Sequence, residues 1–278
     1  MAAPGCMDRW AGRTAVVTGA SSGIGAAVLQ LLAKNGVNVV GLARRHQRVQ
    51  EMAERLKGEK GKVHALRADI TKEDEVVTAF EWIRKNLGGV DILINNAGVT
   101  FKTNITDGEV QHWRMMFELN VIALGTCTRE ALKSMKARNM DDGHIINVCS
   151  VAGNRLPQRM GNFVYCSTKY AAKVITEGLR LELAQKKSHI KVTNLSPGVV
   201  DTEIFDVGGW TATLAGAFES APKLRPDEVA DAIVYALSTP PGVQVNHHTP
   251  LLRQYCSRIY LLCIVDSKTI IIIINTRL

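Results

Sequence analysis

Short apolar runs alternate with amphipathic stretches along most of this chain. Runs rich in β-branched residues predict strands, and stretches with apolar positions at helical spacing predict helices. The predicted strands are Thr14–Thr18, Val37–Leu42, Val63–Leu66, Ile92–Asn95, His144–Val148 and Lys191–Leu195. The predicted helices are Gly25–Asn35, Gln47–Lys57, Glu73–Asn86, a long region from about Gly108 to Arg138, Tyr165–Ala184 and Pro226–Leu237.

Strands and helices in strict alternation predict βαβ units and a parallel sheet that is covered on both faces. The strand runs are apolar on both faces, as in Ala15-Val16-Val17, which a doubly covered sheet requires. The predicted fold class is therefore α/β, a doubly wound parallel sheet of the Rossmann type. No linker or internal repeat interrupts it, so we predict a single domain over residues 1–246.

The tail, residues 247–278, departs from this rhythm. It contains five consecutive isoleucines, Ile270–Ile274, but Asp266–Lys268 keeps its apolar runs shorter than the roughly 20 residues that span a bilayer. The tail fits an extra strand pair, or foreign sequence from another reading frame or an unspliced segment. We favour foreign sequence.

Composition adds little beyond exclusions. The net charge is +8, from 34 basic and 26 acidic residues, but the basic residues are dispersed, so we expect no nucleic-acid partner. The six cysteines include no Cys-x-x-Cys pair, so we expect no metal site. Because residues 1–10 lack the apolar core of a signal peptide, we expect a cytoplasmic protein without an integral membrane segment.

A glycine-rich turn, Thr18–Gly25, follows the first predicted strand and opens the first helix. A dinucleotide cofactor places its pyrophosphate at such a helix N-terminus. Gly19 allows the tight turn, Gly23 lets the pyrophosphate approach the backbone, and Gly25 lets the helix pack closely. Alone, the turn also fits a purely structural role.

The end of the second strand bears on which dinucleotide is bound. NAD-binding enzymes place an Asp or Glu there, which accepts hydrogen bonds from the adenosine ribose. This chain has Ala43, followed by Arg44 and Arg45, and no acidic residue nearby could serve NAD instead. A guanidinium pairs with the 2′-phosphate of NADP, so we predict NADP as the cofactor. The alternative is that both arginines form a solvated helix cap.

Polar residues also follow the next two strands, at the edge where doubly wound sheets bind ligands. Asp69 can accept a hydrogen bond from the adenine amino group. Asn95, which opens Asn95–Gly98, could fix the central strand or line the adenosine site. Each residue alone also fits a simple turn.

The candidate catalytic residues are Asn120, Ser150, Tyr165 and Lys169. Tyr165 and Lys169 are four residues apart on a predicted helix and share a face. An ammonium beside a phenol favours the phenolate, so we expect a lowered pKa for Tyr165, suited to general acid–base catalysis. Ser150 ends the fifth strand, where its hydroxyl can hold a substrate oxygen.

In this order, the motifs resemble the short-chain dehydrogenase/reductase family over about residues 10–245. The shared motifs are Thr18–Gly25, Asn95–Gly98, Asn120, Ser150, Tyr165-x-x-x-Lys169 and Pro197-Gly198. The resemblance implies that Tyr165 is the general acid/base, that Lys169 lowers its pKa and binds the nicotinamide ribose, and that Ser150 stabilises the substrate oxygen. It implies that Asn120 holds a water in a proton relay through Lys169, and that Pro197–Thr202 covers the nicotinamide. The residues expected to contact NADP are Gly19, Ser21, Ser22, Gly23, Ile24, Arg44, Arg45, Asp69, Ile70, Asn96, Ala97, Gly98, Tyr165, Lys169, Pro197, Gly198, Val200 and Thr202.

Finer features resemble the subgroup that contains dehydrogenase/reductase member 11 and the insect NADP-dependent farnesol dehydrogenases. They are Met7–Trp10, Asn139–Ile146 and the long interval from Ser150 to Tyr165. This resemblance implies a lipophilic alcohol or carbonyl substrate, such as farnesol or another isoprenoid alcohol, or a 17β-hydroxysteroid or 3-ketosteroid. The family resemblance implies a homo-dimer or homo-tetramer.

The loop-rich segment Glu203–Leu224 carries Phe205, Trp210 and Phe218, which offer apolar surface for such a substrate. These aromatic residues could instead pack only the loop itself. A non-catalytic NADP(H)-binding protein on the same fold is the alternative function, because fold does not fix function.

Overall fold

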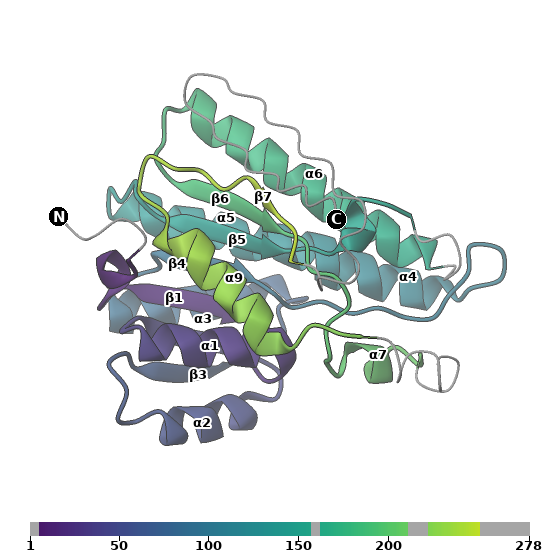
Figure 1. Ribbon diagram of the computed structural model, residues 1–278, viewed down its shortest axis with the longest axis horizontal. Coiled ribbons are helices and arrows are strands. Elements are labelled where there is room, and N and C mark those ends of the chain that lie inside the picture. Colours follow the sequence, from purple (N-terminus) through teal and green to yellow (C-terminus); the bar gives the residue numbers. More distant parts are fainter. Residues whose placement is uncertain (1–5, 157–161, 211–221, 251–278) are drawn as a thin grey trace, which may run out of the picture.

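The computed structural model describes residues 6–156, 162–210 and 222–250. They form one seven-stranded parallel sheet with the order β3-β2-β1-β4-β5-β6-β7 (Figure 1). The strands are β1 (Thr14–Thr18), β2 (Asn38–Ala43), β3 (Val63–Arg67), β4 (Ile92–Asn95), β5 (His144–Val148), β6 (Lys191–Leu195) and β7 (His247–His248). The helices are α1 (Gly23–Lys34), α2 (His46–Arg55), α3 (Glu73–Leu87), α4 (Val110–Phe117), α5 (Leu124–Ala137), α6 (Phe163–Gln185), α7 (Ile204–Val207) and α9 (Pro226–Ser238). Within the described ranges, no helix combines the length and apolar character that crossing a membrane needs.

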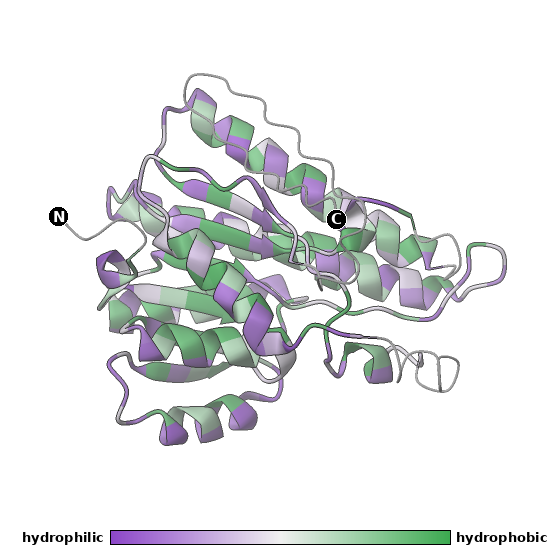
Figure 2. Ribbon diagram, in the orientation of Figure 1, coloured by the Kyte–Doolittle hydropathy of each residue, from purple (hydrophilic) through white to green (hydrophobic). Residues whose placement is uncertain are grey.

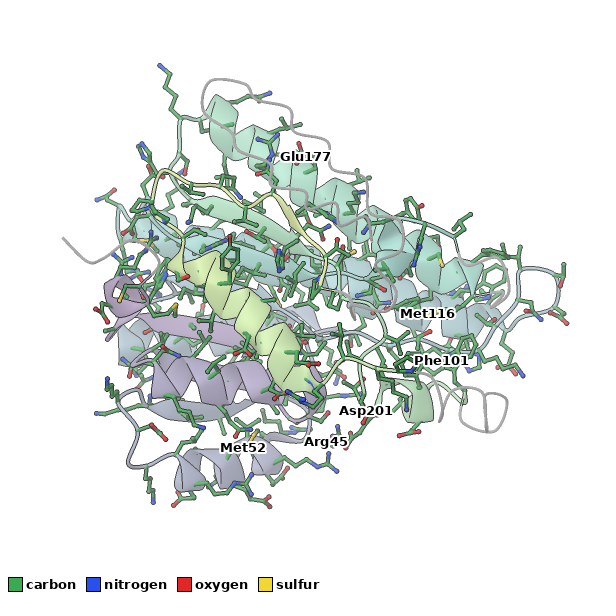
Figure 3. The ribbon with its side chains drawn as sticks, viewed as in Figure 1. Arg45, Met52, Phe101, Met116, Glu177 and Asp201 are labelled. Atoms are coloured by element: carbon green, nitrogen blue, oxygen red, sulfur yellow. The ribbon has the colours of Figure 1, made fainter. Side chains whose placement is uncertain are left out.

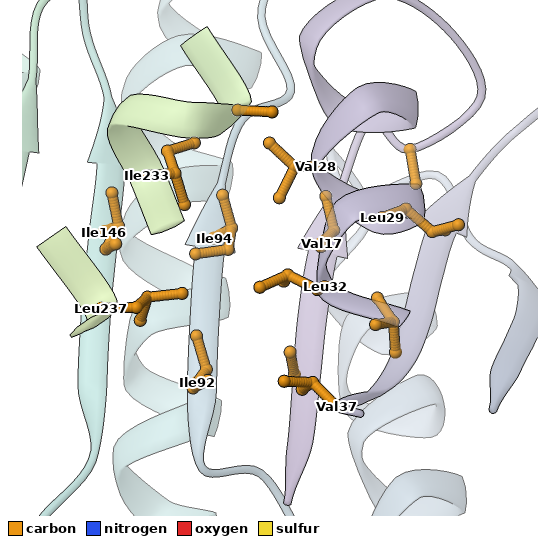
Figure 4. Close-up of a cluster of buried hydrophobic side chains, with 14 of the residues drawn as sticks. Val17, Val28, Leu29, Leu32, Val37, Ile92, Ile94, Ile146, Ile233 and Leu237 are labelled. Atoms are coloured by element: carbon orange, nitrogen blue, oxygen red, sulfur yellow. The ribbon is translucent and has the colours of Figure 1, made fainter. Parts of the chain in front are cut away.

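One face of the sheet is covered by α1 and α9. Val28 and Leu32 of α1 and Ile233 of α9 meet Val17 and Ile94, which project from β1 and β4 (Figure 4). All five side chains are at most 1% exposed. Apolar burial of this kind contributes about 25 cal/mol per Å², so the strands had to be apolar on this face.

The opposite face is covered by α3 and α5. Ile83 of α3 and Met135 of α5 pack with Leu93 and Ile145 of the sheet, again fully buried. Figure 2 shows the result as hydrophobic residues along the central strands and mixed hydropathy on the outer helices. The predicted α/β, doubly wound parallel sheet is confirmed.

The strand order reverses between β1 and β4. From β1 the chain winds outward to β3, then returns to the other side of β1 and winds outward again to β7. Side chains and loops at the carboxyl ends of β1 and β4 therefore diverge, which leaves a crevice at this edge of the sheet. The edge lies on the side of Figure 1 where α7 is drawn.

The helical region predicted between about Gly108 and Arg138 is divided. A π-helix, η2 (Glu118–Ala123), separates α4 from α5, and Asn120 lies within it. Such turns are rare and are frequent at functional sites. The hydrophobic pattern predicted one continuous helical region and did not reveal this π-helical turn.

The sheet continues beyond residue 246, where the predicted domain ends. β7 pairs with β6 in parallel, and the Ser196 amide donates to the His248 carbonyl at 2.7 Å. The Gly198 amide likewise donates to the Pro250 carbonyl at 3.0 Å. Residues up to 250 therefore hold the loop after β6 in place. The remaining tail, to which both interpretations of its origin apply, lies outside the described residues.

Candidate active site

A single cavity of about 1150 Å³ opens at the carboxyl edge of the sheet, across the point where the strand order reverses. Pockets for drug-sized ligands occupy roughly 300–1,000 Å³, so this cavity has room for a dinucleotide and a second molecule. The predicted site residues that line it are Gly19, Ser21, Ser22, Gly23, Ile24, Arg44, Arg45, Asp69, Ile70, Asn96, Ala97, Gly98, Ser150, Tyr165, Lys169, Pro197, Gly198, Val200 and Thr202. Asn120, also predicted, is not among the lining residues and is only 1% exposed.

The glycine-rich turn forms the floor of one end. Gly19 and Gly23 have φ angles of 66° and 53°, in the left-handed region that favours glycine. A Cβ on Gly19 would lie 2.9 Å from the Cα of Ala97, and one on Gly23 would lie 2.9 Å from Cγ2 of Thr202. The turn therefore stays open only without side chains, and its amides at the start of α1 fit a pyrophosphate.

Thr18, at the end of β1, locks this turn to the loop after β4. Its hydroxyl oxygen accepts hydrogen bonds from the amides of Asn96 and Ala97, both at 3.0 Å. The Asn96 side chain donates back to the Thr18 carbonyl at 2.9 Å. The sequence placed Thr18 in the glycine motif but gave it no role, since its partners are more than seventy residues away.

The polar residues after β3 and β4 have different roles. Asn95 is buried, and its amide donates to Thr128 and Asn147, each at 2.9 Å. It therefore fixes the central strands, the first of its two predicted roles. Asp69 lines the cavity, and one carboxylate oxygen accepts from the amide and the hydroxyl of Thr71 at 3.2 and 2.7 Å.

Arginines form the other wall of this end. Arg44 is exposed and makes no hydrogen bond or ion pair with any described residue. Arg45, labelled in Figure 3, donates to the Ser22 hydroxyl at 3.1 Å and to the Glu203 carboxylate at 2.7 Å. Arg48 donates to the other oxygen of that carboxylate at 2.8 Å. Hydrogen bonds from Arg48 and Arg45 lower the pKa of Glu203 to about 2.

The contact with Glu203 brings an acidic residue to the arginines, although the sequence showed none nearby that could serve NAD. Glu203 is 158 positions from Arg45 in the chain, and the loop after β6 brings it there. No local pattern marks such a contact. Arg48, one helical turn beyond Arg44, was missed for the same reason.

The first turns of α6 hold Tyr165 and Lys169 at the opposite end of the cavity. The Asn162 side chain caps the helix by accepting from the Tyr165 amide at 3.4 Å. The Lys169 Nζ lies 5.7 Å from the centre of the Tyr165 ring and donates to the Val148 carbonyl at 3.2 Å. Ser150 lies two residues after the end of β5, where the sequence had expected it to end the strand, and is on the same cavity wall.

Burial sets the protonation states here. It raises the pKa of Tyr165, an effect that the neighbouring Cys149 increases and a hydrogen bond with Ser150 opposes. Burial also lowers the pKa of Lys169. The sequence predicted the reverse direction for Tyr165. The difference arises because both side chains leave water for the same low-dielectric wall, which disfavours the charged form of each.

Asn120 joins the elements that carry these groups. Its side-chain oxygen accepts from the Val99 amide at 2.9 Å. Its NH₂ donates to the Val99 carbonyl at 2.9 Å and to the Thr168 hydroxyl at 3.0 Å. The side chain thus connects η2, the loop after β4 and α6, one residue before Lys169. Thr168 was missed, because a threonine within a helical pattern carries no signal of its own.

Apolar side chains line the remaining wall. Phe205 and Trp210, both predicted, line the cavity together with Leu156 and Val207, which are 56% and 59% exposed. The Trp210 amide donates to the Phe205 carbonyl at 3.0 Å, which closes the short turn around α7. Phe218, also predicted, lies outside the described residues.

Comparison with known proteins agrees with this arrangement. The sequence model of the family described as short chain dehydrogenase matches residues 13–208. Dehydrogenase/reductase SDR family member 11 of Mus musculus is 45% identical over 248 residues, which cover 86% of this chain and 94% of that protein. Farnesol dehydrogenase of Aedes aegypti is 43% identical over 246 residues, covering 87% and 97%.

Two solved structures show the same fold with a bound nucleotide. An alcohol dehydrogenase from the archaeon Thermococcus sibiricus, complexed with 5-hydroxy-NADP, aligns with a TM-score of 0.73 at 27% identity, over 86% of this chain and 95% of that chain. A short-chain dehydrogenase from Sphingobium yanoikuyae in complex with NADPH aligns with a TM-score of 0.72 at 27% identity, over 87% and 89%. The resemblance inferred from the motifs is confirmed, and this chain belongs to the short-chain dehydrogenase/reductase family.

Proposed function

We propose that this chain is an NADP(H)-dependent oxidoreductase that interconverts an alcohol and an aldehyde or ketone on a lipophilic small molecule. One observation carries the proposal. A single cavity joins the glycine-rich turn and Arg44 to Ser150, Tyr165 and Lys169, and it continues along an apolar wall. Two solved structures with the same fold are complexes with 5-hydroxy-NADP and with NADPH, which supports NADP(H) as the cofactor.

Each end of the cavity has a distinct task. When bound, the cofactor would supply the hydride as NADPH or accept it as NADP. The amides at the start of α1 hold the pyrophosphate, and Arg44, which makes no hydrogen bond or ion pair with another described residue, holds the 2′-phosphate. At the other end, the Tyr165 hydroxyl gives a proton to the substrate oxygen in reduction, and in oxidation its phenolate takes one from the alcohol, while the Ser150 hydroxyl holds that oxygen. Lys169 binds the nicotinamide ribose and places its ammonium beside the Tyr165 ring.

The apolar wall favours a long hydrocarbon substrate. Phe205, Trp210, Leu156 and Val207 present aromatic and aliphatic surface with few polar groups. Burial of such a chain stabilises the complex by roughly 25 cal/mol per Å². Because the Aedes aegypti relative is named farnesol dehydrogenase, farnesol is the first substrate to test.

We also propose that the protein is a homo-oligomer. Tyr170, Val174 and Leu181 of α6 are 37%, 70% and 48% exposed, and their spacing places them along one stripe. An exposed apolar stripe on a helix marks an association surface. Light scattering after size-exclusion chromatography should give a mass above that of one chain, and Val174→Glu should reduce it to one chain.

Turnover tests the main proposal. We would follow NADPH formation from NADP and farnesol by its ultraviolet absorbance. Parallel assays would replace NADP with NAD, or farnesol with a 17β-hydroxysteroid. Formation of NADPH with farnesol is the expected result. A protein that binds NADPH but turns over neither alcohol would contradict the farnesol assignment and favour another substrate or a binding role.

A further inference from the structure

Glu203 already places an anion on the arginine wall that contains Arg44, the residue to which the proposed function assigns the 2′-phosphate. Its two carboxylate oxygens receive hydrogen bonds from Arg45 at 2.7 Å and Arg48 at 2.8 Å. The nitrogen of Arg45 that bonds Glu203 also bonds the Ser22 hydroxyl at 3.1 Å. Ser22 belongs to the glycine-rich turn, so the carboxylate lies between that turn and the start of α2.

The segment that carries Glu203 closes over the same end of the cavity. Thr202 lies against Gly23, where a Cβ would come within 2.9 Å of it. Glu203 immediately precedes α7, whose Phe205 belongs to the substrate wall. The ion pair with Arg45 therefore links the phosphate end of the cavity to the segment that shapes the substrate end.

We propose that the Glu203 carboxylate takes the place of the 2′-phosphate of NADP in the free protein. It binds Arg45 and Arg48 until the nucleotide displaces it. This inference rests on the proposed function. A carboxylate and a phosphate present similar oxygen pairs to a guanidinium, but the phosphate carries about −1.5 to −2 charges. The two anions repel each other, so they do not share Arg45.

Exposure keeps the exchange reversible. The side chains of Arg45, Arg48 and Glu203 are 49%, 47% and 43% exposed, so water screens the ion pairs. Exposed pairs of this kind contribute modestly to stability. A dianion that also binds Arg44 can therefore take the place of Glu203, whereas NAD carries no group that competes for it.

Nucleotide binding to the intact chain tests this without any turnover. NADPH, NADH, adenosine 2′,5′-bisphosphate and AMP would be titrated into the wild type and into Glu203→Gln, Glu203→Ala and Asp201→Asn. We expect both Glu203 variants to bind NADPH and the bisphosphate about three- to tenfold more tightly, with NADH and AMP unchanged. Asp201 lies two residues away, with its carboxylate 3.6 Å from Lys223, and controls for the loss of one negative charge.

The outcomes separate the two proposals. Equal changes for NADPH and NADH, in either direction, would show that Glu203 only braces the loop and would overturn the inference. An unchanged NADPH affinity in both variants would do the same, while the wild type's preference for NADPH would leave the proposed function intact. A wild type that binds neither nucleotide would overturn the proposed function and the inference together.

Discussion

The two ends of the cavity hold charged groups in opposite surroundings. At the adenosine end, Arg45 and Glu203 are nearly half exposed, and their hydrogen bonds lower the pKa of the carboxylate. At the catalytic end, Lys169 is 5% exposed, and burial raises the pKa of Tyr165 beside it. Exposed charged groups stay hydrated, so their ion pairs are weak and exchange readily. Charged groups buried in the cavity wall must first lose their hydration, which costs free energy.

This contrast indicates what each end is suited to do. Exchangeable ion pairs at the exposed end can distinguish nucleotides by a modest free-energy difference. At the buried end, a hydroxyl that remains protonated is ready to donate to a carbonyl oxygen. A buried polar group that loses its hydrogen-bond partner there also lowers the stability of the fold. Substitutions should therefore have larger effects at the buried end.

Loss of the Tyr165 hydroxyl should have the largest effect. We expect Tyr165→Phe to reduce kcat by about 10²- to 10⁴-fold, the range for general acid–base catalysis, because no proton can then be exchanged with the substrate oxygen. NADPH affinity should change little. Tyr235→Phe on α9, at a position that is 51% exposed, is the matched control in the same turnover assay. A Tyr165→Phe protein with wild-type kcat would remove this residue from the mechanism.

Substitution of Asn120 should destabilise the fold. Asn120→Ala leaves the Val99 amide and carbonyl without their partner in a site that is 1% exposed, while the Thr168 hydroxyl keeps its hydrogen bond to the Tyr165 carbonyl. Buried unsatisfied groups cost about 1–3 kcal/mol each, so we expect unfolding free energy to fall by about 2–4 kcal/mol. Asn38→Ala removes solvent-exposed hydrogen bonds with Gly12 and Lys62 from a half-buried residue at the start of β2, and should cost less than about 1 kcal/mol in the same urea titration. Similar losses of unfolding free energy for both variants would contradict the expected difference between buried and exposed hydrogen bonds.

The pH dependence of turnover should follow the raised pKa of Tyr165. Carbonyl reduction needs the protonated hydroxyl, which a pKa above the ordinary value of 10 preserves through neutral pH. We therefore expect kcat/KM for reduction to be flat between about pH 6 and 9, and that for alcohol oxidation to rise about tenfold per pH unit. A reduction profile that falls near neutral pH would instead support the lowered pKa predicted from the Tyr165–Lys169 spacing.

The sequence predicted the fold because local rules determine it. Strands such as Val16-Val17 are apolar on both faces, and helices between them repeat their apolar positions every three or four residues. The glycine-rich turn was also recognisable, since Gly19 and Gly23 perform their roles within a few residues of each other. Such features depend on neighbours along the chain.

The sequence could not predict features that depend on distant segments or on burial. The contact of Glu203 with Arg45 joins residues 158 positions apart, through a loop without periodicity. The hydrogen bond between Asn120 and Thr168 likewise connects separate helices. The pKa of Tyr165 was predicted in the wrong direction because spacing reports a nearby charge but not the loss of water around both groups.

Arg44 should give the smallest effect and the clearest sign at the exposed end. It makes no hydrogen bond or ion pair among the described residues, so Arg44→Asp should leave folding unchanged while repelling a 2′-phosphate. We expect NADPH to bind about five- to tenfold more weakly, and NADH as well or better, because a carboxylate accepts hydrogen bonds from the ribose. Arg55→Asp, at the far end of α2, controls for the change in net charge in the same fluorescence titrations. Equal losses for NADPH and NADH would mean that Arg44 attracts nucleotides only through its general charge, and the selectivity would then have to come from Arg45 and Arg48.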